Sequence, residues 1–234
     1  MSKIKRKSER KKNSALGTYS RAEIAEILSK LRGTARLKVG LMYGSGLRQS
    51  ELLSLRVKDI NFDNSNIFVR GGKDGGDRTT LLPQSLIPAL VKQISLVKKI
   101  HAQDIADGYG DVSLPAAESV ANPSAAKEIS WQFLFSFPRR ERDLASAVMI
   151  RNQLHPFSLT RLLNLAFAAA KIHQPPKAHV FRMSFAAHLL ESGQNERTIQ
   201  GLLGLKGLTD NEAGAHVMYR NWKGVISPLD NVSI

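Results

Sequence analysis

The sequence predicts an α+β fold that is mostly helical and contains a small antiparallel β-sheet. Apolar residues recur at helical spacing along much of the 234-residue chain, whereas residues 56–82 show short β-like runs between turn-forming residues. Hydrophobic residues make up 42% of the chain, enough to bury a core. We expect a disordered basic tail over residues 1–16 and one folded domain over residues 17–234.

The first expected elements are helices. Ser20 and Glu23 have the spacing of a capping box, which predicts a helix that runs until Gly33. A second helix is expected over residues 35–44. The Gly-Ser-Gly run that ends there breaks the chain, and a third helical stretch follows over residues 49–55.

The sheet is expected next. Residues 57–60, 67–69 and 79–82 are β-like runs, separated by the turn-forming stretches 63–66 and 71–77. A proline directly after the third run ends the pattern. These runs therefore predict hairpins of a small antiparallel sheet.

The second half returns to helices. Helical spacing covers residues 86–106, and the small residues of 108–122 favour a loop. Residues 139–142 are expected to form a charged loop. From residue 158 onward the chain is expected to be mostly helical.

Composition and motifs exclude several classes of chemistry. The chain has no cysteine, which rules out disulfides, thiolate zinc sites and cysteine nucleophiles. It has no HExxH pair, no P-loop, no dinucleotide fingerprint and no run of 18 apolar residues. We therefore expect no metal, no small-molecule cofactor and no membrane partner, and a cytoplasmic location.

The net charge of +14 predicts a polyanionic partner. Residues 1–16 hold seven Lys or Arg and one Glu, a net charge of +6, so the tail and the folded part are both basic. The tail is either a solubilising extension or an arm attracted to phosphates.

Four residues stand in settings suited to phosphate chemistry. Arg48 is at an expected helix start, where backbone N–H groups and the guanidinium could hold a phosphate oxygen together. Lys73 lies at the tip of the glycine-rich hairpin, and His179 and Arg182 are one helical turn apart. Singly, each also fits an ordinary role, such as a surface arginine, a solvated turn or a histidine with local partners.

In their order along the chain, these segments resemble the catalytic domain of tyrosine recombinases, and integron integrases in particular. The resemblance covers about residues 17–230. Residues 122–128 are similar to an extra helical insertion of integron integrases, and residues 224–230 are similar to their ending. The other segments that carry it are residues 41–51, residues 55–60, the hairpin with Lys73 and Arg78, and residues 179–191.

The resemblance implies a mechanism. In such enzymes two arginines brace the scissile phosphate, a lysine protonates the leaving 5′ oxygen, a histidine assists proton transfer, and a tyrosine attacks to form a 3′-phosphotyrosyl link. Arg48 and Arg182 are then the clamp, Lys73 the general acid and His179 the assisting histidine, with Arg78 as a further DNA contact. The implied partner is duplex DNA at recombination sites in a bacterial nucleoid, bound by a synaptic homo-tetramer.

The chain also departs from the family pattern. Met183 and Leu205 stand where the family has histidines, and both are apolar and expected to pack. Gly214 occupies the position counted for the nucleophilic tyrosine, and glycine has no side chain that could attack. Tyr219 is a candidate substitute, but on a continuous helix it would point roughly 140° away, which favours a packing or surface role.

Three functions stay open at this point. The first is a site-specific recombinase domain whose strand exchange is impaired. The second is a noncatalytic DNA-binding remnant that occupies recombination sites, since the family's N-terminal clamp domain is expected to be missing and the basic tail stands in its place. The third is a nonspecific binder of RNA or another polyanion, motivated by net charge alone.

Overall fold

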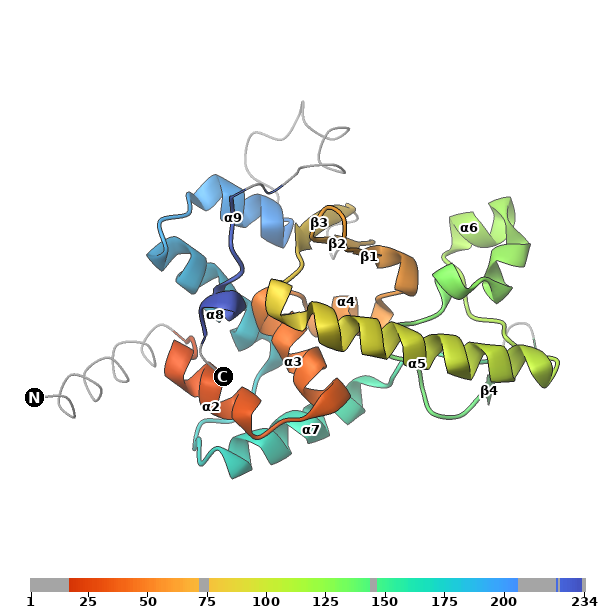
Figure 1. Cartoon of the computed structure of the whole chain (residues 1–234), viewed down its shortest axis with the longest axis horizontal. Coiled ribbons are helices and arrows are strands. Elements are labelled where there is room, and N and C mark those ends of the chain that lie inside the picture. Colours follow the sequence, from red (N-terminus) through yellow and green to blue (C-terminus); the bar gives the residue numbers. More distant parts are fainter. Residues whose placement is uncertain (1–16, 72–75, 144–146, 206–221, 223, 233–234) are drawn as a thin grey trace, which may run out of the picture.

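Helices dominate the computed structural model, which describes residues 17–71, 76–143, 147–205, 222 and 224–232 (Figure 1). The expected basic tail lies outside these residues. The α-helices are α2 (Arg21–Ser29), α3 (Gly33–Gly44), α4 (Gln49–Ser54), α5 (Ile87–Ala106), α6 (Ala116–Ala121), α7 (Pro156–Ala169), α8 (Ala178–Glu191) and α9 (Glu196–Leu203). The strands are β1 (Ile60–Asn61), β2 (Asn66–Val69), β3 (Arg78–Leu81), β4 (Glu141–Arg142) and β5 (Met149–Ile150). Short 3₁₀ helices are η1 (Val57–Asp59), η2 (Gln84–Leu86), η3 (Pro123–Lys127), η4 (Ile129–Trp131) and η6 (Pro228–Asn231).

The predicted capping box at the start of α2 is confirmed. The Ser20 hydroxyl accepts a hydrogen bond from the Glu23 N–H at 3.2 Å, and the Glu23 carboxylate accepts one from the Ser20 N–H at 2.9 Å. Two N–H groups that a helix start would otherwise leave unpaired are thereby satisfied. The helix ends at Ser29, four residues earlier than expected, and α3 already begins at Gly33.

The three-stranded sheet is antiparallel, in the order β1-β2-β3, and Ile67 lies opposite Thr80. The second and third β-like runs form strands as expected, but the first is mostly the 3₁₀ turn η1. The reason is local: the Arg56 N–H donates to the Asp59 carboxylate at 2.9 Å, which closes a turn where a strand would need an extended backbone. All four residues of β3 are buried, and α9 packs against this strand.

The largest apolar cluster includes buried residues of α2, α3, α7 and α8. Tyr19, Tyr43, Phe167 and Phe181 are at most 2% exposed, and Tyr19 contacts both phenylalanine rings. A second apolar cluster joins β3, α8 and α9. Its members are Leu81, Phe185, Leu189, Ile199, Leu202 and Leu203.

A third apolar cluster includes two residues, Val112 and Ala125, of the segment that the sequence assigned to a loop and an insertion; its other buried members are Trp131 and Phe133. That segment contains α6, whose residues Ala116–Ala121 include good helix formers but no buried side chain, and then η3. Arg56, directly before η1, contacts this region: its guanidinium lies 4.2 Å from the Phe133 ring centre and donates to the backbone carbonyls of Trp131 and Ser113, both at 2.7 Å. Burial lowers the pKa of Arg56 to about 10.

Two further features of the fold bear on function. The expected charged loop at residues 139–142 includes β4, which pairs with β5. Within the described part of the chain, no helix is long and apolar enough to cross a membrane, and no three His, Asp or Glu side chains gather as a metal site would require.

Candidate functional site

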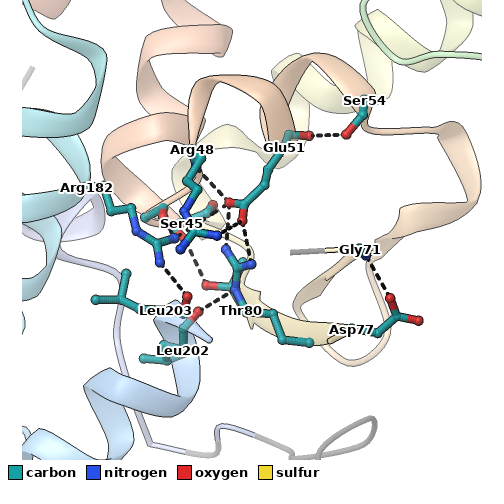
Figure 2. Close-up of polar contacts among 12 residues, drawn as sticks. Ser45, Arg48, Glu51, Ser54, Gly71, Asp77, Thr80, Arg182, Leu202 and Leu203 are labelled. Carbon is teal, nitrogen blue, oxygen red and sulfur yellow. Dashed lines mark hydrogen bonds and ion pairs between the residues drawn. The ribbon is translucent and has the colours of Figure 1, made fainter. Parts of the chain in front are cut away.

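A buried carboxylate, that of Glu51, has three arginines around it (Figure 2). Glu51 is 5% exposed. Arg78 donates to both carboxylate oxygens, each at 2.7 Å. Arg48 and Arg182 approach the same carboxylate through their Nη1 atoms, at 3.3 Å and 3.6 Å. Charged side chains from parts of the chain that are far apart in sequence therefore lie close together, at the start of α4, on β3 and on α8.

Arg48 is placed by the start of α4. It is the N-cap residue, and its backbone N–H donates to the Glu51 carboxylate at 2.7 Å. The backbone turns into this position through Gly46, which has φ of +62° and packs so tightly that an added Cβ would lie 2.5 Å from the Phe185 ring. A quarter of the Arg48 side-chain surface is exposed.

Arg182 lies on α8 and joins three parts of the site. Its Nη1 donates to the Gly46 carbonyl at 2.8 Å, and its Nη2 donates to the Leu203 carbonyl at the end of α9. The residue is 7% exposed. The guanidinium is therefore held in place by backbone groups as well as by Glu51.

Arg78 is the most deeply buried of the three arginines, with 2% exposure. Its Nε donates to the Leu202 carbonyl at 3.0 Å. Gly204 ends α9 with φ of +64°, and a Cβ at this position would lie 2.7 Å from the Arg78 Cδ. The glycine thus lets the end of α9 close over the arginine. The folded chain turns Arg78 toward Glu51, and its expected role as a DNA contact stays a prediction.

The electrostatics favour an ionised Glu51. Burial is the largest single influence and would raise the pKa of the carboxyl group, but the hydrogen bonds and charge of Arg78 oppose it most strongly. The Arg48 N–H and the charge of Arg182 act in the same direction. The net result is a Glu51 pKa below its ordinary value.

His179 lies on the outward side of α8 and is exposed. It is one turn before Arg182, and this separation is what the spacing predicts. Met183 and Leu205 were expected to pack, and this is wrong: they are 50% and 46% exposed. Met183 follows His179 by one turn and shares its outward side. The inward positions of α8 are filled by Val180, Phe181, Ser184 and Phe185.

Three predicted positions lie outside the described residues: Lys73, Gly214 and Tyr219. Their roles stay predictions. Sequence reasoning also missed Glu51, although a signal was present. An acidic residue three positions after a helix start is the same capping-box spacing that was used for Ser20 and Glu23.

Comparison with known proteins decides the family. The model of the phage integrase family matches residues 19–211, a range that contains every element of the arginine site. The chain belongs to the phage integrase family. The domain is thus of the tyrosine recombinase class, and the fold class predicted from the sequence is confirmed.

Relatives of this phage integrase family domain are longer proteins. The domain is 38% identical over 208 residues to an integrase/recombinase of Escherichia coli, and the match covers 89% of this chain and 62% of that protein. It is 30% identical over 204 residues to the tyrosine recombinase XerA of Pyrococcus furiosus, covering 87% of this chain and 57% of that protein. The chain therefore spans less than two thirds of the length of either relative.

Solved structures share the fold. The crystal structure of XerA recombinase superposes with a TM-score of 0.56 at 20% identity, covering 81% of this chain and 56% of the other. The Tn1549 transposon integrase in complex with transposon right end DNA gives 0.54 at 18% identity, with 81% and 58% covered.

Proposed function

We propose that this domain binds duplex DNA at recombination sites as part of a site-specific recombinase of the integron-integrase type. The observation that carries the proposal is the convergence of Arg48 and Arg182 on the Glu51 carboxylate. Two guanidinium groups that reach the same carboxylate lie close enough together to bind one phosphate, since both anions present paired oxygens.

The proposed chemistry needs fixed cations and no metal. A phosphodiester gains negative charge in the transition state, and guanidinium groups that are already fixed, as Arg182 is by the Gly46 and Leu203 carbonyls, stabilise that charge without having to reorganise. The tyrosine hydroxyl gives up its proton, in a transfer that His179 assists, as its oxygen bonds to phosphorus. The bond to the 5′ oxygen breaks, and Lys73 supplies the proton to that oxygen. His179 is exposed, one turn before Arg182.

Strand exchange by this chain is proposed to be impaired, because Gly214 stands where the nucleophilic tyrosine is expected. The second candidate follows from the same observation: a noncatalytic protein that occupies recombination sites through the retained arginines. Both candidates require DNA binding, and they differ in whether Tyr219 attacks the phosphate.

The names of similar proteins support the DNA partner. The Escherichia coli relative is called an integrase/recombinase, and the related transposon integrase was solved in complex with DNA. Assembly as a synaptic homo-tetramer on DNA belongs to the same proposal and follows from the family resemblance.

Duplex binding tests the phosphate-binding role. Fluorescence anisotropy with a labelled duplex is measured between about 50 and 200 mM salt, and the wild-type affinity is expected to fall steeply. Arg48→Ala and Arg182→Ala are each expected to weaken binding and to reduce the slope of log affinity against log salt by about 1. Arg161→Ala, which removes an exposed arginine of α7, is the control for loss of charge alone. Salt-independent binding, or a clear preference for structured RNA, contradicts the proposal.

Covalent trapping separates the two candidates. A duplex that carries a nick beside the cleavage position holds any 3′-phosphotyrosyl product, which is detected on a denaturing gel. An adduct that disappears in Tyr219→Phe supports the recombinase reading with Tyr219 as nucleophile. DNA binding without an adduct supports the noncatalytic reading.

A further inference from the structure

We propose that Arg78 is a positioning residue that neutralises the Glu51 carboxylate and so prevents it from competing with a DNA phosphate for Arg48 and Arg182. The inference rests on the proposed phosphate-binding role of these two arginines. It gives Arg78, which is buried and turned toward Glu51, a part in the function of the site.

The distances rank the three contacts of the carboxylate. Arg78 meets it with two parallel hydrogen bonds of 2.7 Å, whereas the Nη1 atoms of Arg48 and Arg182 lie at 3.3 Å and 3.6 Å. Bidentate pairing of this kind is the strongest arrangement between a guanidinium and a carboxylate. Glu51 is thus satisfied first by Arg78, and the other two arginines are its weaker partners.

Competition is the reason such pairing matters. Carboxylate and phosphate oxygens are the same kind of acceptor for a guanidinium fork. An ionised Glu51 without its bidentate partner would draw Arg48 and Arg182 more closely to itself, and any phosphate would have to displace it. With Arg78 in place, the cluster of three arginines and one carboxylate keeps a net charge of +2.

Arg78 is held so that it serves Glu51 and not solvent. Its guanidinium also donates to the Leu202 carbonyl, and the end of α9 closes over its side chain at Gly204. With 2% exposure, the residue would have to leave its strand neighbours before reaching a phosphate. We therefore infer that its effect on DNA passes through the carboxylate.

A purely structural role makes different predictions. If Arg78 only stabilises the fold, its loss should lower stability whatever happens at position 51, and should not make DNA binding depend on pH. If Arg78 neutralises Glu51, removal of the carboxylate should compensate for removal of the arginine.

The pH dependence follows from the groups that face Glu51. Among the described residues, those paired with it are Arg48 at the N-cap of α4, Arg78 from β3 and Arg182 from α8, while Arg56, Asp59 and Arg70 line the same pocket as Glu51. Without Arg78 the main influence that lowers the pKa of Glu51 is lost, and burial raises that pKa. As the pH falls, the carboxyl group of the Arg78→Met variant takes up a proton and stops competing. DNA affinity of this variant should then rise toward the wild-type value.

The experiment compares four forms of the full chain by anisotropy on one duplex at fixed salt: wild type, Arg78→Met, Glu51→Gln and the double variant. Arg78→Met is expected to bind about tenfold more weakly near neutral pH, and the double variant to return to within about threefold of wild type. Arg151→Met is the matched control, because Arg151 also donates to both oxygens of a buried carboxylate, Asp104. It loses the same charge and is expected to stay within about threefold of wild type at every pH.

Two results overturn the inference: wild-type affinity in Arg78→Met, or a double variant as weak as Arg78→Met. Urea unfolding checks that each form is folded. If Arg78→Met does not fold, Arg78→Lys is used in its place. A lysine keeps the positive charge but cannot form two parallel hydrogen bonds, so an intermediate affinity is expected. A ¹³C NMR titration of Glu51 needs no DNA. If the wild type does not bind DNA, the phosphate-binding role fails, while an unchanged Glu51 pKa in the Arg78 variant refutes the neutralising role separately.

Discussion

Gly46→Ala tests whether the turn before α4 organises the arginine site. Gly46 has φ of +62°, a region that costs a residue with a Cβ about 1 to 2 kcal/mol. The added Cβ would also lie 2.5 Å and 2.8 Å from two ring atoms of Phe185 and 3.1 Å from Leu203. Contacts this short force a fully buried ring to move, which costs about 1 to 3 kcal/mol.

These costs are partly offset in the unfolded chain. Alanine has less backbone freedom there than glycine, which favours folding by about 0.4 to 1 kcal/mol. The expected net loss is about 1 to 4.5 kcal/mol, read as a lower urea midpoint with an unchanged slope. Because the Gly46 carbonyl accepts a hydrogen bond from Arg182, DNA affinity should fall as well.

Gly193→Ala is the matched control. Gly193 has φ of +87°, and an added Cβ would meet nothing within 4 Å. The backbone cost of about 1 to 2 kcal/mol and the same unfolded-state offset therefore apply, without a steric cost. DNA affinity should be unchanged in this variant. Equal stability losses in the two variants would refute the argument from steric contact with Phe185. Wild-type DNA affinity in a destabilised Gly46→Ala would refute the link to Arg182.

Three further changes follow from single contacts. Burial lowers the pKa of His188 to about 4, so the unfolded chain binds a proton first. Stability should be full well above pH 6.5 and fall by about 3 kcal/mol toward pH 4. Ser20→Ala removes the cap shared with Glu23 and should cost about 1 kcal/mol. Trp222→Phe removes the indole hydrogen bond to the Thr79 carbonyl, 3.1 Å long, and should also cost about 1 kcal/mol.

The urea midpoint of unfolding measures the change in stability in all three cases. His188→Gln should flatten the acid limb of the stability curve, and a curve unchanged by this substitution contradicts the assignment to His188. Ser20→Thr should keep most of the stability lost in Ser20→Ala. A stability loss in Trp222→Phe that is no larger than the experimental error would show that the indole N–H is solvated equally well in the unfolded chain.

Local pattern determined much of this protein from the sequence. Capping-box spacing placed the start of α2, helical periodicity placed α5, and the turn-rich stretch placed the hairpin between β2 and β3. Arg48 at a helix start and the one-turn spacing of His179 and Arg182 are likewise local, since neighbours within a turn interact wherever the helix lies. Local pattern failed where a side chain changed the backbone, as Asp59 does in turning the first β-like run into η1.

Tertiary structure alone decided which charges meet. Glu51 lies 27 residues from Arg78 and 131 from Arg182, and no periodicity within an element links positions so far apart. They meet because α9 packs on β3 and α8 packs on α3, which brings the Leu202 and Leu203 carbonyls and the Gly46 turn to the same place. The same packing buried Arg78 and left Met183 outside. Sequence could therefore name the cations of the site, but only the packed core could show that a carboxylate stands between them.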